Sequence, residues 1–131
     1  MARVALPAIL YVATVFAAAF LLGTLRVLVL VPRLGELAAV TLEVPVVLGL
    51  SWLAAGRVLR RWPLPRPGQR LAMGGLAFAL LMLAETVLGI TLFGRSLPGI
   101  LGAMATLPGL VGLAGQIGFG LVPALRGQPS G

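Results

Sequence analysis

The chain has 131 residues, of which 60% are hydrophobic and only 10% are charged, whereas soluble domains carry about 25% charged residues. So few charged side chains exclude an ordinary soluble domain. The sequence has no cysteine and no histidine, which excludes thiol catalysis, disulfides and the usual ligand sets of zinc, copper, haem and iron–sulfur clusters, and we expect no cofactor.

The net charge of +7 comes from ten arginines and three glutamates. A strongly basic chain can bind nucleic acid, but that function needs a basic face on a soluble fold. Here most arginines lie at the ends of long apolar runs, which is the distribution found in membrane proteins. We therefore expect the lipid bilayer, and no nucleic acid, as the partner of this chain.

Four long apolar runs follow one another along the sequence. They cover residues 5–31, 37–59, 71–93 and 97–125. Each is long enough to cross a hydrocarbon core about 30 Å thick, and a span of this length in lipid forms a helix. The first run continues well beyond the apolar centre of a signal peptide, so it is predicted to be a membrane helix. The prediction is one all-α membrane domain over residues 1–131, a four-helix bundle made of two helical hairpins.

The arginines predict the orientation of this bundle. Arg3, Arg126 and the five arginines in and beside the loop at 60–70 lie on one side, while Arg33 and Arg95 lie on the other. The positive-inside rule then places both termini and this loop in the cytoplasm, with the protein in the cell membrane. The same rule accounts for the loop arginines, which are also candidates for binding anionic lipid head groups. These candidates are Arg57, Arg60, Arg61, Arg66 and Arg70.

Three charged residues, Arg26, Glu43 and Glu85, lie well inside the predicted spans, away from the loop at 60–70. A charge near the centre of a membrane helix costs about 2.5–3.5 kcal/mol. Counted from the predicted outer helix ends, all three lie at similar depths of about 9–13 Å. Opposite charges that face one another offset this cost, so we predict that the three form one polar site. Threonines at similar depth are expected to complete its hydrogen bonding: Thr41, Thr86 and Thr106.

Two simpler interpretations stay open. The long side chain of Arg26 could reach the outer surface, and the pair of Arg26 and Glu43 could be a structural lock between helices. Glu85 is harder to explain in this way, because a short side chain at that depth cannot reach water unaided. One arginine and two glutamates also leave one excess negative charge, which a proton or a small cation would balance.

The last run carries small or amide side chains at spacings of three and four residues, which form one face if the run is a continuous helix. These residues are Gly102, Ala105, Gly109, Gly112 and Gln116. Such a face lets a second helix approach closely. The second helix could belong to the same chain, to another copy or to another membrane protein. We expect a homo-oligomer, because four helices of this size enclose little space alone.

Three classes of function fit these features. The first is a small transporter or channel for an ion or small solute, with Arg26, Glu43 and Glu85 open to the outer face. The second is a non-catalytic accessory or scaffold subunit of a larger membrane complex. The third is a membrane enzyme acting on a lipid or quinone, which is the least supported because no nucleophile–base pair is visible.

Overall fold

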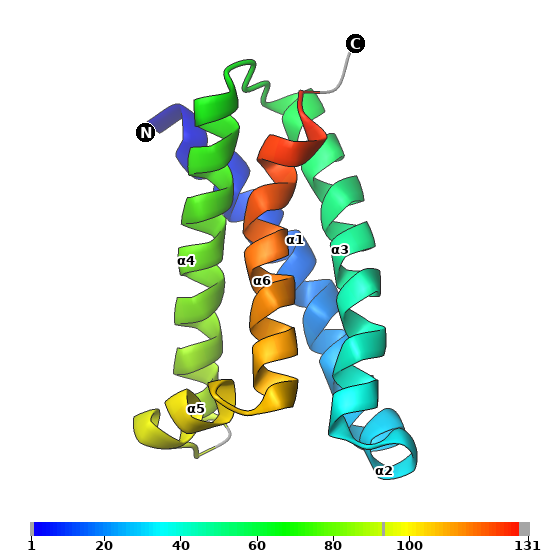
Figure 1. Ribbon diagram of the computed structural model, residues 1–131. Helices are drawn as coiled ribbons and strands as arrows, with labels where there is room; N and C mark the ends of the chain where they lie inside the picture. Colours follow the sequence, from blue (N-terminus) through cyan, green and yellow to red (C-terminus); the bar gives the residue numbers. More distant parts are fainter. Residues whose placement is uncertain (1, 93, 129–131) are drawn as a thin grey trace.

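A computed structural model of the chain describes residues 2–92 and 94–128 (Figure 1). Its helices are α1 (Ala2–Leu25), the π-helix η1 (Arg26–Leu30), α2 (Val31–Leu34), α3 (Glu36–Arg61), α4 (Pro67–Thr91), α5 (Leu97–Met104) and α6 (Leu107–Arg126). Phe93, the last residue of the third apolar run, lies outside the described residues. The side chain of Arg3, which the orientation prediction uses, is also not described.

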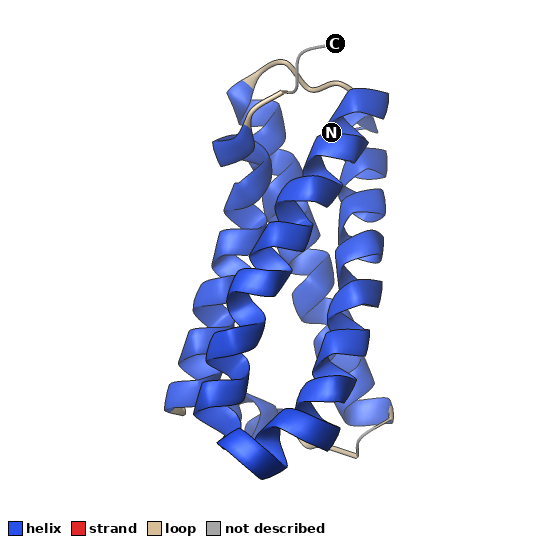
Figure 2. Ribbon diagram, turned by 90° about the vertical axis from the view of Figure 1, so that its right-hand side faces the viewer, coloured by secondary structure: helices blue, strands red, loops and turns tan. Residues whose placement is uncertain are grey.

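Four of the helical segments are long and apolar enough to cross a membrane. They are Val4–Leu34, which runs through α1, η1 and α2, and the helices Glu36–Arg61, Pro67–Thr91 and Leu107–Arg126. The described residues contain helices and loops and no strand (Figure 2). The predicted all-helical class with four candidate spans is therefore confirmed.

The four long helices form a bundle in which α6 packs between α3 and α4, and α1 contacts the same two helices (Figure 1). Both termini and the α3–α4 loop lie at one end of the bundle, which we call the terminal end. The short helices α2 and α5 lie at the opposite end, which we call the turn end. Gly35 makes the turn between α2 and α3, with a φ of 86° that favours glycine.

The prediction of a single helix over residues 97–125 is wrong, because the helix breaks between α5 and α6. Thr106 is the N-cap of α6, and its hydroxyl accepts a hydrogen bond from the amide of Gly109 at 3.2 Å. Pro108 stands in the first turn, where a missing N–H leaves no helix bond unmade. The proline therefore begins a helix instead of kinking one. The eight residues of α5 are too few to span a bilayer.

The packed apolar core lies in the half of the bundle nearest the terminal end. Its buried members are Val4, Ala8, Tyr11, Val12 and Val15 of α1, Ala54, Ala55, Val58 and Leu59 of α3, Leu64 of the loop, Met73, Ala77 and Leu81 of α4, and Phe119 and Val122 of α6. Among the described residues of the other half, the buried hydrophobic side chains are Ala39 and Val40. The bundle is thus densely packed at the terminal end and loosely packed at the turn end.

Glycines set the closest helix contacts. A Cβ atom added to Gly74 of α4 would overlap the backbone carbonyl of Gly120 of α6, so the two backbones meet directly. On another side of α6, a Cβ atom added to Gly115 would lie 2.9 Å from a methyl group of Val44 in α3. The glycines of α6 therefore pack against helices of the same chain.

Polar side chains at the end of α6 and just after it stabilise the terminal end. The side chain of Gln128 accepts a hydrogen bond from the amide of Leu64 at 2.8 Å and donates one to the carbonyl of Leu59 at 2.8 Å. The guanidinium of Arg126 lies 5.4 Å from the ring centre of Trp52, within the range of a cation–π contact. These contacts hold the end of α6 against α3 and the α3–α4 loop.

Candidate functional site

Arg26 is the first residue of the π-helix η1, within the first span. The amide of Val31 bonds to the carbonyl of Arg26, five residues earlier, which gives the wider π turn. Pro32 follows directly, and in a regular α-helix its ring would clash with the carbonyl of Leu28. The sequence thus provides a local reason for the wider turn at the position where the charged residue lies. Single π turns of this kind occur frequently at functional sites.

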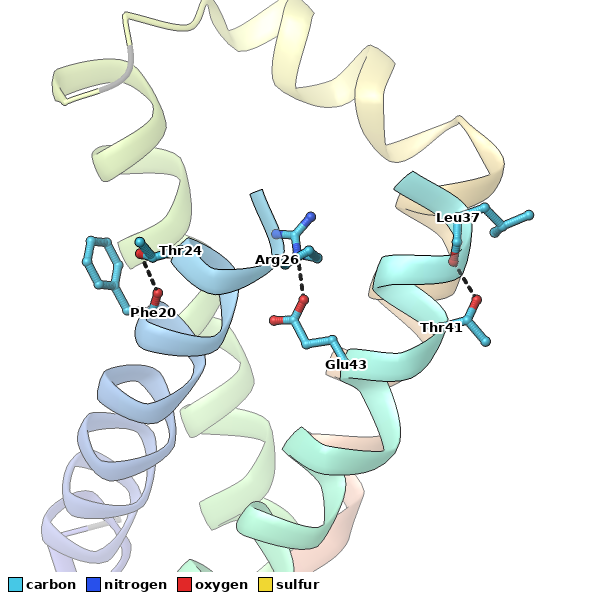
Figure 3. Close-up of polar contacts among 6 residues, drawn as sticks. All are labelled: Phe20, Thr24, Arg26, Leu37, Thr41 and Glu43. Atoms are coloured by element: carbon cyan, nitrogen blue, oxygen red, sulfur yellow. Dashed lines mark hydrogen bonds and ion pairs between the residues drawn. The ribbon is translucent and has the colours of Figure 1, made fainter. Parts of the chain in front are cut away.

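The side chains of Arg26 and Glu43 point toward each other (Figure 3). The Nε atom of Arg26 lies 2.5 Å from Oε2 of Glu43, and the two side chains are 26% and 16% exposed. This ion pair joins the first span to α3 in the loosely packed half. No other ion pair is found among the described residues. The charge of each partner neutralises the charge of the other.

Glu85 makes a different contact. The Nε2 atom of Gln116 on α6 donates a hydrogen bond to Oε2 of Glu85 on α4, at 2.6 Å. Glu85 is exposed on the isolated chain, whereas Gln116 is half-buried. Among the described residues, neither Arg26 nor Glu43 makes a hydrogen bond or an ion pair with Glu85. Of the three charges predicted to form one site, the structure pairs two and leaves Glu85 with a neutral partner.

Each of the four candidate spans has one charged or amide side chain about two turns in from its turn-end terminus. We call this set the polar layer: Arg26, Glu43, Glu85 and Gln116. At a rise of about 1.5 Å per residue, all four lie about 9–14 Å from the turn-end terminus of their helical segment. By this count the four side chains lie at similar levels along the bundle.

From the sequence alone, Gln116 is predicted to belong to the helix-packing face and not to the polar site. With a continuous helix over residues 97–125, Gln116 falls past the middle of the span. The break before α6 moves the start of the span to Leu107 and brings Gln116 level with Glu85. The signal that could have placed it correctly is Thr106 followed by Pro108, an N-cap and first-turn pattern.

Two of the three predicted threonines, Thr41 and Thr106, donate hydrogen bonds to nearby backbone carbonyls. The hydroxyl of Thr41 donates to the carbonyl of Leu37 at 2.7 Å, as Figure 3 shows, and the residue is exposed. The hydroxyl of Thr106 donates to the carbonyl of Ala103 at 2.6 Å while it caps α6. Thr86 follows Glu85 in α4 and is half-buried. The hydroxyl protons of Thr41 and Thr106 are therefore engaged by backbone carbonyls and do not reach the charged side chains.

The helix break also divides the predicted small-residue face, which comprised Gly102, Ala105, Gly109, Gly112 and Gln116. Gly102 belongs to α5 and Ala105 to the break, and both are exposed. A Cβ atom on Gly109 would overlap the backbone of Ala103, so this glycine permits the tight α5–α6 turn. A Cβ atom on Gly112 would lie 3.9 Å from Val40 of α3. The five residues do not form one continuous helix face.

The candidate lipid-binding arginines fall into two groups. The exposed group at the terminal end consists of Arg57, Arg60, Arg61 and Arg66. Arg70 is buried, and its Nη1 donates hydrogen bonds to the carbonyls of Leu64 at 2.9 Å and Pro65 at 3.1 Å. Arg70 therefore holds the shape of the α3–α4 loop.

The chemistry available in the polar layer is binding and exchange of charge. Its groups are one guanidinium, two carboxylates and one amide, which can hold an ion, a proton or a small polar solute. Among the described residues, no three carboxylate, thiol or imidazole groups lie close enough together to form a metal site. The layer also contains no hydroxyl or thiol nucleophile with an adjacent base.

No known protein family, curated protein or solved structure matches this chain. The class of the protein therefore follows from its own fold and composition. It is an all-helical protein with four helices that are long and apolar enough to span a membrane.

Proposed function

We propose that this protein is a small membrane transporter or channel for an ion or small solute, and that the polar layer is its binding site. The observation that supports this most strongly is that all four spans place one charged or amide side chain at the same level, in the half of the bundle that lacks an apolar core. Ionisable groups within membrane spans cost free energy, and they typically mark ion or substrate pathways.

The distribution of arginines supports an orientation for this site. Arg33 and Arg95 belong to the turn end, and the other described arginines outside the polar layer belong to the terminal end. By the positive-inside rule, the terminal end faces the cytoplasm of a cell membrane and the turn end faces outward. The polar layer is then reached from the outer face. The arginines of the exposed group at the terminal end contact anionic lipid head groups in this arrangement.

The packed core of the terminal half fills the path below the polar layer in a single bundle. Passage across the membrane therefore requires that helices move apart there or that several copies form a pathway together. A homo-oligomer remains part of the proposal for this reason.

The alternative of an accessory or scaffold subunit receives less support. That role was based on a bare face of the last helix that could dock a partner protein. Of that predicted face, Gly112 instead lies against Val40 of α3, and Gly109 lies against Ala103 in the α5–α6 turn of the same chain. An enzyme acting on a lipid or quinone receives the least support of the three functions, because the polar layer lacks a nucleophile–base pair.

The test is flux through the purified protein in liposomes, measured for a panel of inorganic ions and small solutes under imposed gradients. Glu85→Gln is expected to abolish flux while membrane insertion and oligomeric state stay unchanged. Glu36→Gln is the matched control, because this glutamate is exposed in the first turn of α3 and lies outside the polar layer. If the wild-type protein moves no species and copurifies with a larger membrane complex, the accessory role replaces transport.

A further inference from the structure

The charge balance of the polar layer narrows the class of ligand. Nε of Arg26 lies 2.5 Å from Glu43, so the only cationic group in the layer is already matched by one carboxylate. An anionic ligand would have to displace Glu43 before it could use Arg26, and it would be repelled by both glutamates. The layer is therefore poorly suited to an anion.

Glu85 is the group whose charge is left over. Its partner, Gln116, is neutral and engages only Oε2. Among the described residues, neither Oε1 of Glu85 nor the side-chain carbonyl oxygen of Gln116 makes a hydrogen bond. Two oxygens from adjacent helices α4 and α6, one of them charged, thus remain available. Carboxylate and amide oxygens are the ligands that hard cations such as alkali metal ions prefer.

From this arrangement we infer that the polar layer binds a small monovalent cation between Glu85 and Gln116, in exchange for a proton on Glu85. One arginine against two glutamates leaves a single negative charge, which a monovalent ion neutralises completely, whereas a divalent ion would leave a new positive charge. The ion pair of Arg26 and Glu43 stays closed and contributes no net charge. This inference rests on the proposed function and names its substrate class.

The binding test uses dicyclohexylcarbodiimide, which dissolves in the bilayer and adds to a protonated carboxyl group to give a stable acylurea. Full-length protein in liposomes is labelled at fixed pH, with Na⁺ or K⁺ replacing an equal concentration of N-methylglucamine, and labelling of Glu85 is followed by mass spectrometry. At least one of the two metal ions is expected to slow the labelling several-fold, because a bound ion displaces the proton. Glu85→Gln should remove the label.

Gln116→Leu should abolish most of the protection by the metal ion while Glu85 is still labelled. Gln69→Leu is the matched control, because Gln69 lies in the first turn of α4, far along the helix from Glu85, and should leave protection unchanged. Labelling of Glu85 that proceeds equally fast with Na⁺, K⁺ and N-methylglucamine overturns the cation site.

A second measurement separates failure of this inference from failure of transport. Because exchange of one monovalent cation for one proton moves no net charge, the fluxes of the metal ion, the proton and chloride are followed separately with ion-sensitive dyes in liposomes under NaCl or KCl gradients. Flux of chloride without flux of Na⁺ or K⁺ overturns the cation site and leaves transport standing. Protection of Glu85 by a metal ion without any measurable flux supports the site and removes the transport function.

Discussion

The hydroxyl group of Tyr11 on α1 donates a hydrogen bond to the backbone carbonyl of Phe119 on α6, at 2.6 Å, and the two aromatic rings stack with their centres 4.5 Å apart. Both side chains are almost completely buried. Pro123, four residues after Phe119, has no N–H group, so this carbonyl lacks its usual helix donor. Tyr11 supplies the missing donor and joins the first span to the last inside the packed half.

Tyr11→Phe should therefore leave a buried carbonyl without a hydrogen bond. The expected loss in the free energy of unfolding is about 1–3 kcal/mol, the usual cost of an unsatisfied buried polar group. Reversible unfolding in mixed detergent micelles measures it. In a Pro123→Ala background the new amide can bond to the carbonyl of Phe119, so the same substitution should cost clearly less. Equal costs in the two backgrounds would show that the proline is not the reason for this contact.

The ion pair of Arg26 and Glu43 should stabilise the loosely packed half. Arg26→Gln leaves the carboxylate of Glu43 without its partner, and we expect it to cost about 1–3 kcal/mol, between the values for exposed and for buried pairs because both side chains are partly exposed. The double variant Arg26→Gln/Glu43→Gln should be more stable than Arg26→Gln alone. A double variant whose loss equals the sum of the two single losses would mean that the pair does not interact.

The close contact of α4 and α6 depends on Gly74. Because a Cβ atom there meets the backbone carbonyl of Gly120, Gly74→Ala should push the helices apart and cost about 1–3 kcal/mol, the range for overpacked cores. Gly75→Ala is the matched control: its Cβ would have nothing within 4 Å, so stability should stay level or rise by up to about 1 kcal/mol through helix propensity. If both variants lose the same stability, the contact is not tight.

Gln128 should stabilise the α3–α4 loop against local opening. Gln128→Ala removes the hydrogen bond to the amide of Leu64, and the free energy of local opening there should fall by about 0.5–1.5 kcal/mol. Hydrogen exchange of that amide measures the change. Gln69→Ala, which affects the bond to the amide of Arg66, should leave exchange at Leu64 unchanged. Faster exchange at Leu64 in both variants would indicate that the loop opens as a whole.

Much of the fold can be predicted from local sequence signals. Four apolar runs of sufficient length predict four spans, and Gly35 marks the turn between the first two. The expectation of one continuous helix over residues 97–125 is wrong because a new helix begins at Leu107. The pattern of Thr106 before a first-turn proline indicates a new helix start, and this pattern alone would have corrected both the span and the level of Gln116.

The sequence by itself determined that the chain is all-helical with four candidate spans, and that Arg26, Glu43 and Glu85 lie inside them at similar depth. Hydropathy, helix breaks and the rise per residue are properties of a local segment, so no other part of the chain is needed to read them. Only the tertiary structure decided that Glu43 pairs with Arg26 while Glu85 bonds to Gln116. Which side chains meet depends on the rotation and tilt of each helix, and these are set by contacts far apart in the sequence, such as Gly74 with Gly120 and Tyr11 with Phe119.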